Sequence, residues 1–135
     1  MAHAVSIKQT ADTANLVEWA KLALRDLKTP VLRVTRLRYD GTDQPLALEE
    51  VVLPLDRFSG LTPNGGDIPD IVELAQRYGL SLGHAAERIS IIQASTDVAL
   101  HLGIAVGANV MKSDRIAETT DGEPIEWRVS FKRYA

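Results

Sequence analysis

The sequence predicts an α+β fold: a mostly antiparallel sheet with helices packed on one face, built from two similar halves. The first observation is a repeated plan of strand, helix, strand, Asp-Gly turn and strand in the outer parts of the chain. The second is a shared spacing, long enough for a duplicated unit. Three hairpin positions recur about 79 residues later: Arg36, Pro45 and Leu46 correspond to Arg115, Pro124 and Ile125.

The first half begins with a short alternating strand and a helix. Apolar residues recur at helical spacing from Leu16 to Leu27. Thr10, Asp12 or Thr13 are the candidate N-caps, and Pro30 prevents the helix from continuing. The predicted strands of this half are residues 4–9, 31–39 and 46–55, of which the last two form a hairpin through the turn at 40–43.

The middle of the chain differs from both halves. Residues 59–69 are rich in Gly, Pro, Asn and Asp, which predicts a loop with a turn at Asn64-Gly65-Gly66. A short helix follows at 70–78 and ends at Gly79. In the second half, the sequence predicts a strand at 86–93 and a helix at 97–102, which Ser95 or Thr96 caps and Gly103 ends. A strand within 106–116, a turn at Asp121-Gly122 and a last strand at 124–131 follow.

Composition limits the possible functions. A chain of 135 residues fits one domain, which we expect to span 1–135. Because it has no cysteine, disulfides and cysteine-based metal sites are excluded. No apolar run approaches the roughly 20 residues that span a bilayer, and the N-terminus lacks a signal-peptide layout. We therefore expect a cytoplasmic protein with no membrane contact, and the net charge of −3 argues against direct nucleic-acid binding.

Four side chains on the two hairpins are candidates for ligand contact. Arg36 and Arg38 are two apart on a strand, so they share a face and suit a carboxylate or phosphate. Glu49 and Glu126 lie on returning strands, where a carboxylate can accept hydrogen bonds from ligand hydroxyls. The alternative is a solvent-facing basic stripe for the arginines and surface ion pairs for the glutamates.

Other chemistries have little support. The three histidines, His3, His84 and His101, are too dispersed to predict a metal site, and Asp67 with Asp70 is explained by loop and cap chemistry. A P-loop and a nucleophile elbow are both missing. The sequence thus predicts no metal, no cofactor and no catalytic residue.

An ordered set of motifs resembles the UTRA domain, the effector-binding module of GntR/HutC-type transcription regulators. Its opening hairpin resembles residues 34–41 with Pro45 and Glu49, and the end of its central helix resembles Arg77-Tyr78-Gly79. Further along, residues 94–103, which begin with Ala94 and end in Leu102-Gly103, resemble the helix of that domain that follows an alanine and ends in Leu-Gly. Its closing hairpin resembles residues 121–126.

The resemblance implies the chorismate lyase-like fold, with an enclosed ligand site and a homodimer formed through the sheets. Ligand contacts are then expected from Arg36, Arg38, Glu49 and Glu126, with Lys132 serving an anion where relatives commonly carry Tyr. Relatives that bind phosphosugars often have Ser-x-Tyr at the central helix, where this chain has Pro69-Asp70-Ile71. The expected effector is anionic or polyhydroxylated.

Three functions follow from this resemblance. The first is a ligand sensor of a bacterial transcription regulator, which contacts DNA only through an N-terminal winged helix-turn-helix that this chain does not contain. The second is a chorismate lyase-like enzyme that eliminates pyruvate from chorismate, with Glu126 assisting. The third is a dimerisation module with a vestigial pocket. The chain is either a fragment of a regulator, which its end at Tyr134-Ala135 favours, or a stand-alone protein.

Overall fold

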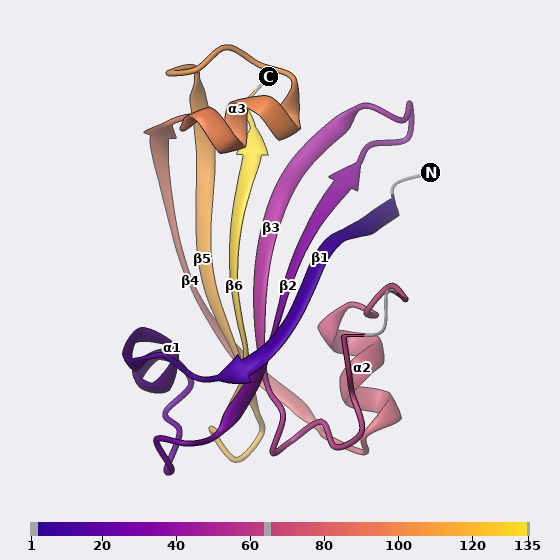
Figure 1. The fold of residues 1–135 in the computed structure, drawn as a ribbon, viewed down its shortest axis with the longest axis vertical. Helices are drawn as coiled ribbons and strands as arrows, with labels where there is room; N and C mark the ends of the chain where they lie inside the picture. Colours follow the sequence, from indigo (N-terminus) through magenta and orange to yellow (C-terminus); the bar gives the residue numbers. More distant parts are fainter. Residues whose placement is uncertain (1–2, 64–65, 135) are drawn as a thin grey trace.

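The computed structural model describes residues 3–63 and 66–134, and this part of the chain forms one antiparallel sheet with three helices (Figure 1). The strand order is β1-β2-β3-β6-β5-β4. Within these ranges none of the helices has the length and apolar character that a membrane span requires. In chain order the elements are β1 (His3–Thr13), α1 (Leu16–Lys21), β2 (Pro30–Tyr39), β3 (Pro45–Pro54), α2 (Ile71–Arg77), β4 (Leu82–Gln93), α3 (Thr96–Leu102), β5 (Asn109–Thr119) and β6 (Pro124–Arg133).

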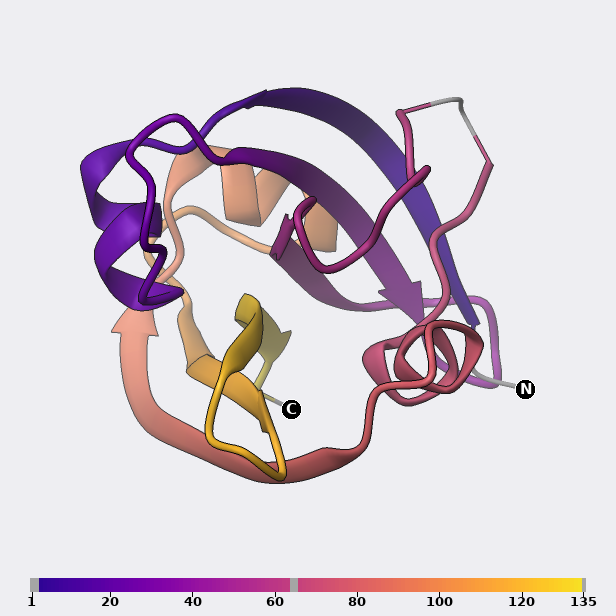
Figure 2. The same ribbon diagram turned by 90° about the horizontal axis from the view of Figure 1, so that it is seen from below.

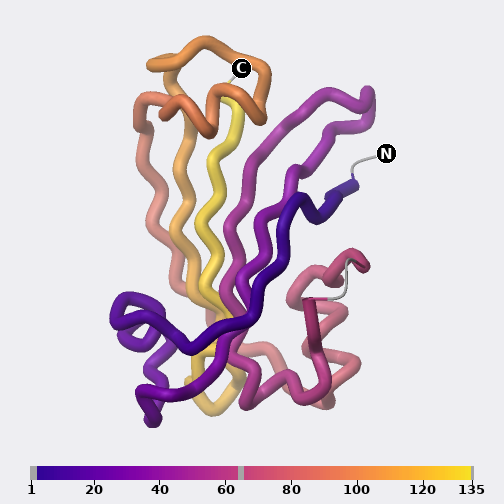
Figure 3. The backbone as a smooth tube through the Cα atoms, in the orientation of Figure 1, coloured from indigo at the N-terminus to yellow at the C-terminus, as the bar shows by residue number. Residues whose placement is uncertain are grey.

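The predicted α+β class and the two similar halves are confirmed. The halves β1-α1-β2-β3 and β4-α3-β5-β6 meet where β3 pairs with β6. Glu50 pairs there with Val129, so the two residues are themselves about 79 positions apart, as the repeat requires. In Figure 3 the β2–β3 turn and the β5–β6 turn lie at opposite ends of the sheet, as expected when two copies pair antiparallel.

Helices cover both faces of the sheet, which corrects the prediction that they cover one. Side chains on a strand alternate between faces. Leu32 and Val34 pack against α2, whereas Val31 and Leu37 pack in the clusters that contain Trp19 of α1 and Val98 of α3. Helices α1 and α3 therefore share one face, and α2 covers the other, which is called the α2 face below.

Helix α1 is shorter than predicted and has a different cap. Asn15 is the N-cap: its side chain accepts from the Glu18 backbone N–H at 2.8 Å, and the Glu18 carboxylate accepts from the Asn15 N–H at 2.9 Å. The helix ends at Lys21, because the chain turns through Ala23 with a φ of 49°. The predicted helix to Leu27 and the predicted caps at 10–13 are wrong, since β1 runs on to Thr13 and uses those residues.

The other predicted helix ends are confirmed. Ser95 caps α3 through its side chain, and Gly103 ends it with a φ of 66°, a left-handed conformation that glycine adopts without strain. Strand β4 starts at Leu82, earlier than the predicted 86. Residues 64 and 65 of the predicted Asn64-Gly65-Gly66 turn lie outside the described residues.

The segment between β3 and α2 reaches the β1 edge of the sheet. Figure 2, seen from below, shows it on the same side as α2. The Gln9 side chain donates to the Gly66 carbonyl, and the Ser6 backbone N–H donates to Asp67 at 3.0 Å. These contacts hold the chain that leads into α2 over the α2 face.

The N-caps of α1 and α3, which occupy equivalent places in the two halves, give a matched test of how these helices are held. We expect Asn15→Ala to lower the free energy of unfolding by about 1–2 kcal/mol, because it removes a cap with reciprocal hydrogen bonds. Ser95→Ala removes one side-chain bond of 3.2 Å and should cost about 0.5–1 kcal/mol. Urea unfolding of both variants measures the difference; an equal or reversed order would contradict this account of α1.

Candidate functional site

The α2 face of β2 and β3 changes from apolar to charged along the strands. Leu32, Val34 and Val51 are buried against α2 at one end. The next positions on the same face are Arg36 and, across the ladder, Glu49, which pairs with it in register. Because the strands continue without a break, these charged side chains point into the same layer as the core.

Arg36, Arg38, Glu49 and Asp70 form one ion-pair network, called the Arg36 cluster below. The Glu49 Oε1 atom accepts from Arg36 Nε at 2.8 Å and from Arg38 Nη2 at 3.0 Å. Arg36 is only 3% exposed and Glu49 5%. Burial opposes the charge of Glu49, but the Arg38 hydrogen bond and the Arg36 charge outweigh it and lower the pKa.

Asp70 joins this network across the sequence. It is the N-cap residue of α2, but its side chain makes no capping hydrogen bond. Its Oδ1 atom instead lies 3.0 Å from Arg38 Nη2 and 3.1 Å from Arg36 Nη2. Burial opposes its charge too, yet the two arginines lower its pKa. The prediction of cap chemistry for Asp70 is therefore wrong for the side chain, which binds arginine.

Glu126 lies beside the Arg36 cluster, but its pKa is shifted in the opposite direction from those of Glu49 and Asp70. Its side chain on β6 is 1% exposed, and burial raises its pKa although the charges of Arg128, Arg36 and Arg115 act the other way. A carboxyl with a raised pKa keeps its proton to higher pH and can donate a hydrogen bond. The site thus combines two ionised acids with one carboxyl that is biased toward the neutral form.

Two buried polar atoms of the site have no hydrogen-bond partner within the described residues. They are Arg36 Nη2, which is close to Asp70 but poorly aligned with it, and Glu126 Oε1. Buried polar atoms are almost always satisfied, so each orphan needs an explanation. A ligand that accepts from the guanidinium and bonds to the carboxyl would satisfy both.

The remaining predicted contact, Lys132, lies further out. It is exposed on β6 and pairs in register with Ala47, which pairs with Arg38. The structure thus brings together Arg36, Arg38 and Glu49 and places Glu126 nearby, whereas Lys132 sits at the rim. Sequence reasoning missed Arg128, whose charge acts on both Asp70 and Glu126; its position two residues after Glu126 was the available signal.

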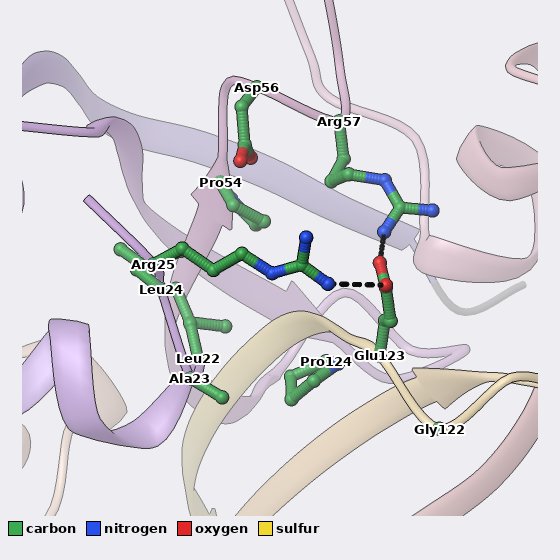
Figure 4. Close-up of a pocket in the computed structure, with 10 residues that line it drawn as sticks. All are labelled: Leu22, Ala23, Leu24, Arg25, Pro54, Asp56, Arg57, Gly122, Glu123 and Pro124. Atoms are coloured by element: carbon green, nitrogen blue, oxygen red, sulfur yellow. Dashed lines mark hydrogen bonds and ion pairs between the residues drawn. The ribbon is translucent and has the colours of Figure 1, made fainter.

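Other candidate sites are less suited to a ligand. A hollow of about 470 Å³ lies between the segment that follows α1, the end of β3 and the turn that joins β5 to β6 (Figure 4). Its two arginines, Arg25 and Arg57, both point at Glu123 and are already paired by it. In the described part of the chain, no group of three His, Cys, Asp or Glu residues is placed to hold a metal ion.

The raised pKa of Glu126 predicts a pH-dependent effect of Glu126→Gln. A carboxyl whose pKa is raised by folding binds its proton more tightly in the folded state. Its contribution to stability therefore falls as pH rises above its ordinary value of 4.5. The glutamine variant should gain stability relative to the native protein as pH increases from there toward neutrality.

Urea unfolding at several pH values measures this difference. Glu50→Gln, at an exposed carboxyl on the adjacent β3, is the control for loss of a negative charge. A Glu126→Gln effect that is constant with pH would show that the buried carboxyl does not carry the extra proton.

Comparison with known proteins identifies the domain type. Residues 6–134 match the family model of the UTRA domain. A curated relative is the HTH-type transcriptional regulator Rv0792c of Mycobacterium tuberculosis, 36% identical over 95 residues, which are 67% of this chain and 35% of the relative. The chain thus spans about a third of that relative's length.

Solved structures share the fold. The ligand-binding domain of a GntR-family transcriptional regulator from Bordetella bronchiseptica has a TM-score of 0.89 at 24% identity, with 98% of this chain and 85% of that one covered. The effector domain of PhnF from Mycobacterium smegmatis has a TM-score of 0.89 at 23% identity, with 99% and 82% covered. This chain belongs to the UTRA domain family, and its fold is that of GntR-family effector domains.

Proposed function

We propose that this domain binds a small anionic or polyhydroxylated effector for a GntR/HutC-type transcription regulator. The effector lies on the α2 face and contacts Arg36, Arg38, Glu49, Glu126 and Lys132. The observation that carries this proposal is the pair of unsatisfied polar atoms, Arg36 Nη2 and Glu126 Oε1, in side chains that are 3% and 1% exposed. Burying such atoms without a hydrogen bond costs stability, even where an ion pair such as Arg36–Asp70 is close, and a ligand that completes these bonds would recover it.

Asp70 occupies the place of the effector's acidic group. Its carboxylate contacts both arginines, as a ligand carboxylate or phosphate would. Its side chain is also 53% exposed, so an incoming anion can reach the same guanidinium groups. Binding therefore replaces an internal anion with an external one.

This exchange supplies a route to regulation. Asp70 starts α2, and the segment before it is tied to β1 through Ser6 and Gln9. Releasing Asp70 loosens the start of α2 from β2, so the liganded and free domains differ in how α2 is held. An effector shifts a regulator only when it binds its two states unequally, and this difference provides the two states.

The remaining parts of the proposal concern the whole regulator. DNA contact belongs to a separate N-terminal winged helix-turn-helix, in keeping with the helix-turn-helix name of the curated relative. The domain forms a homodimer through its sheet in the cytoplasm. The exposed apolar side chains of β4, Ile89 and Ile91, support such an interface.

A thermal-shift screen tests effector binding. The panel contains sugars, sugar phosphates, aromatic and dicarboxylic acids, and chorismate. A ligand at about 100 times its Kd adds about 2.7 kcal/mol of stability, which raises Tm by several degrees in a domain of this size. The shift should disappear in Arg36→Ala and Arg38→Ala and persist in Arg25→Ala, an exposed arginine outside the site.

Two outcomes would contradict the proposal. A shift that survives both arginine substitutions would place the effector elsewhere. Conversion of chorismate to 4-hydroxybenzoate and pyruvate, lost in Glu126→Gln, would favour the lyase alternative, in which the buried carboxyl acts on a substrate rather than on an effector.

Asp70→Asn tests the exchange of anions. The amide keeps the shape of the side chain but no longer competes as a charge for the arginines. We expect the affinity for the effector found in the screen to rise by about tenfold, because a hydrogen bond to a charged group contributes about 1.5–3 kcal/mol. The free domain should lose about 1 kcal/mol of stability.

Isothermal titration and urea unfolding measure the two effects. Glu73→Gln, which removes an exposed carboxylate from the same helix, is the matched control. Equal or weaker effector binding by Asp70→Asn would show that Asp70 does not occupy the effector's place.

A further inference from the structure

The internal repeat places two arginines where the first half has an ion pair. On β2 and β3, Arg36 is opposite Glu49. The corresponding pair on β5 and β6 is Arg115 opposite Arg128. Like charges directly opposite each other on neighbouring strands destabilise a sheet. The second half therefore lacks the anion that Glu49 supplies in the first.

The nearby acids act on this pair only through their charge, Asp70 on Arg128 and Glu126 on both arginines, and within the described residues neither acid forms a hydrogen bond or ion pair with them. Both arginines are half-buried, and across the described residues neither makes a side-chain hydrogen bond or ion pair. Glu87 lies opposite Arg115 on β4, but its carboxylate accepts from the Ser113 hydroxyl at 2.7 Å. On the other side of Arg128, the partner on β3 is the apolar Val51.

The arginine pair belongs to the same face as the Arg36 cluster. Arg128 pairs with Val51, which packs against α2, and the charges of both arginines act on Glu126. Strands β2 and β5 are separated by β3 and β6, so they lie about 14 Å apart. Arginine side chains that extend from both strands over this face can contact the two ends of one small molecule.

We propose that Arg115 and Arg128 form a second anion-binding subsite, which receives a carboxylate or phosphate group at the far end of the effector. The inference rests on the proposed function, since it assigns a second acidic group to the effector of the same site. Bidentate hydrogen bonds from two guanidinium groups suit such a group and remove the repulsion between them.

Inorganic phosphate is the probe, because it can occupy each subsite separately. Backbone amide shifts in NMR spectra of the labelled chain, at constant ionic strength, report each site by itself. We expect phosphate to move the amides at 113–115 and 128–130, independently of those at 36–38. Arg128→Glu recreates the charge pattern of the first half. It should raise Tm without phosphate and weaken phosphate binding at Arg115 about tenfold or more.

Lys112→Glu is the matched control. It makes the same change of charge on β5, and its side chain points to the opposite face of the sheet, since it is an odd number of positions from Arg115. This variant should retain the phosphate shifts at 113–115 and 128–130. Isothermal titration should find two phosphate sites in the native chain and in Lys112→Glu, and one in Arg128→Glu.

The other possible results of these phosphate titrations distinguish the second subsite from the proposed function. Shifts confined to 36–38 would refute the second subsite and leave the proposed function standing. Shifts confined to 113–115 and 128–130 would support the subsite and count against the proposed role of Arg36 and Arg38. Shifts at the second site that depend on protein concentration and not on phosphate would refute it, since acidic groups of a second copy would then neutralise the arginines.

Discussion

The buried guanidinium of Arg36 is the constraint on which the rest of the site depends. A charge that is 3% exposed is tolerated in a protein interior only with close partners of opposite sign. Glu49 supplies one from the neighbouring strand, and Asp70 supplies another from the start of α2. Glu126, a third acid close by, is buried without such a partner, and its pKa is raised as a result. Arg36 therefore links the start of α2 to the sheet through Asp70, and together with Arg38 it lowers the pKa of Glu49 and Asp70, whereas burial raises the pKa of Glu126.

The internal repeat explains the frame of the sheet, and its departures mark the chemistry. Pairing of β3 with β6 around Glu50 and Val129 places equivalent hairpins side by side in opposite directions. Two departures from this repeat bear on the site. Helix α2 is inserted between the halves and covers one face, and the position of Glu49 in the first half is held by Arg128 in the second. Duplication thus accounts for the backbone architecture, whereas charges that break the symmetry account for the ligand preference that we propose.

The sequence predicts the positions of the strands along the chain better than it predicts the site. Alternation between apolar and polar residues is a local signal, and it locates β2, β3 and β6 to within a few residues. Helix α1 is overestimated because its apolar spacing continues past the point where Ala23 takes a positive φ and the chain turns back. Asp70 is assigned to capping because its true partners are more than 30 positions away, and such contacts leave no local pattern. Arg128 is missed because its role depends on which residues lie opposite it on the neighbouring strands. That register is known only once the two halves are paired in the sheet.

The location of the charges explains how the proposed anionic effector acts on this fold. If Arg36 were paired only within β2 and β3, a ligand would bind to a rigid sheet and change little around it. Part of the neutralisation of Arg36 comes from Asp70, the acid that begins α2. The position of α2 and the neutralisation of the Arg36 charge are therefore linked in free energy. In the proposed function, an external anion takes over the neutralisation and leaves α2 held by its apolar contacts with Leu32 and Val34. The same link acts in reverse. Any contact that fixes α2 in its present position makes Asp70 a stronger competitor for the arginines and lowers the affinity for the effector.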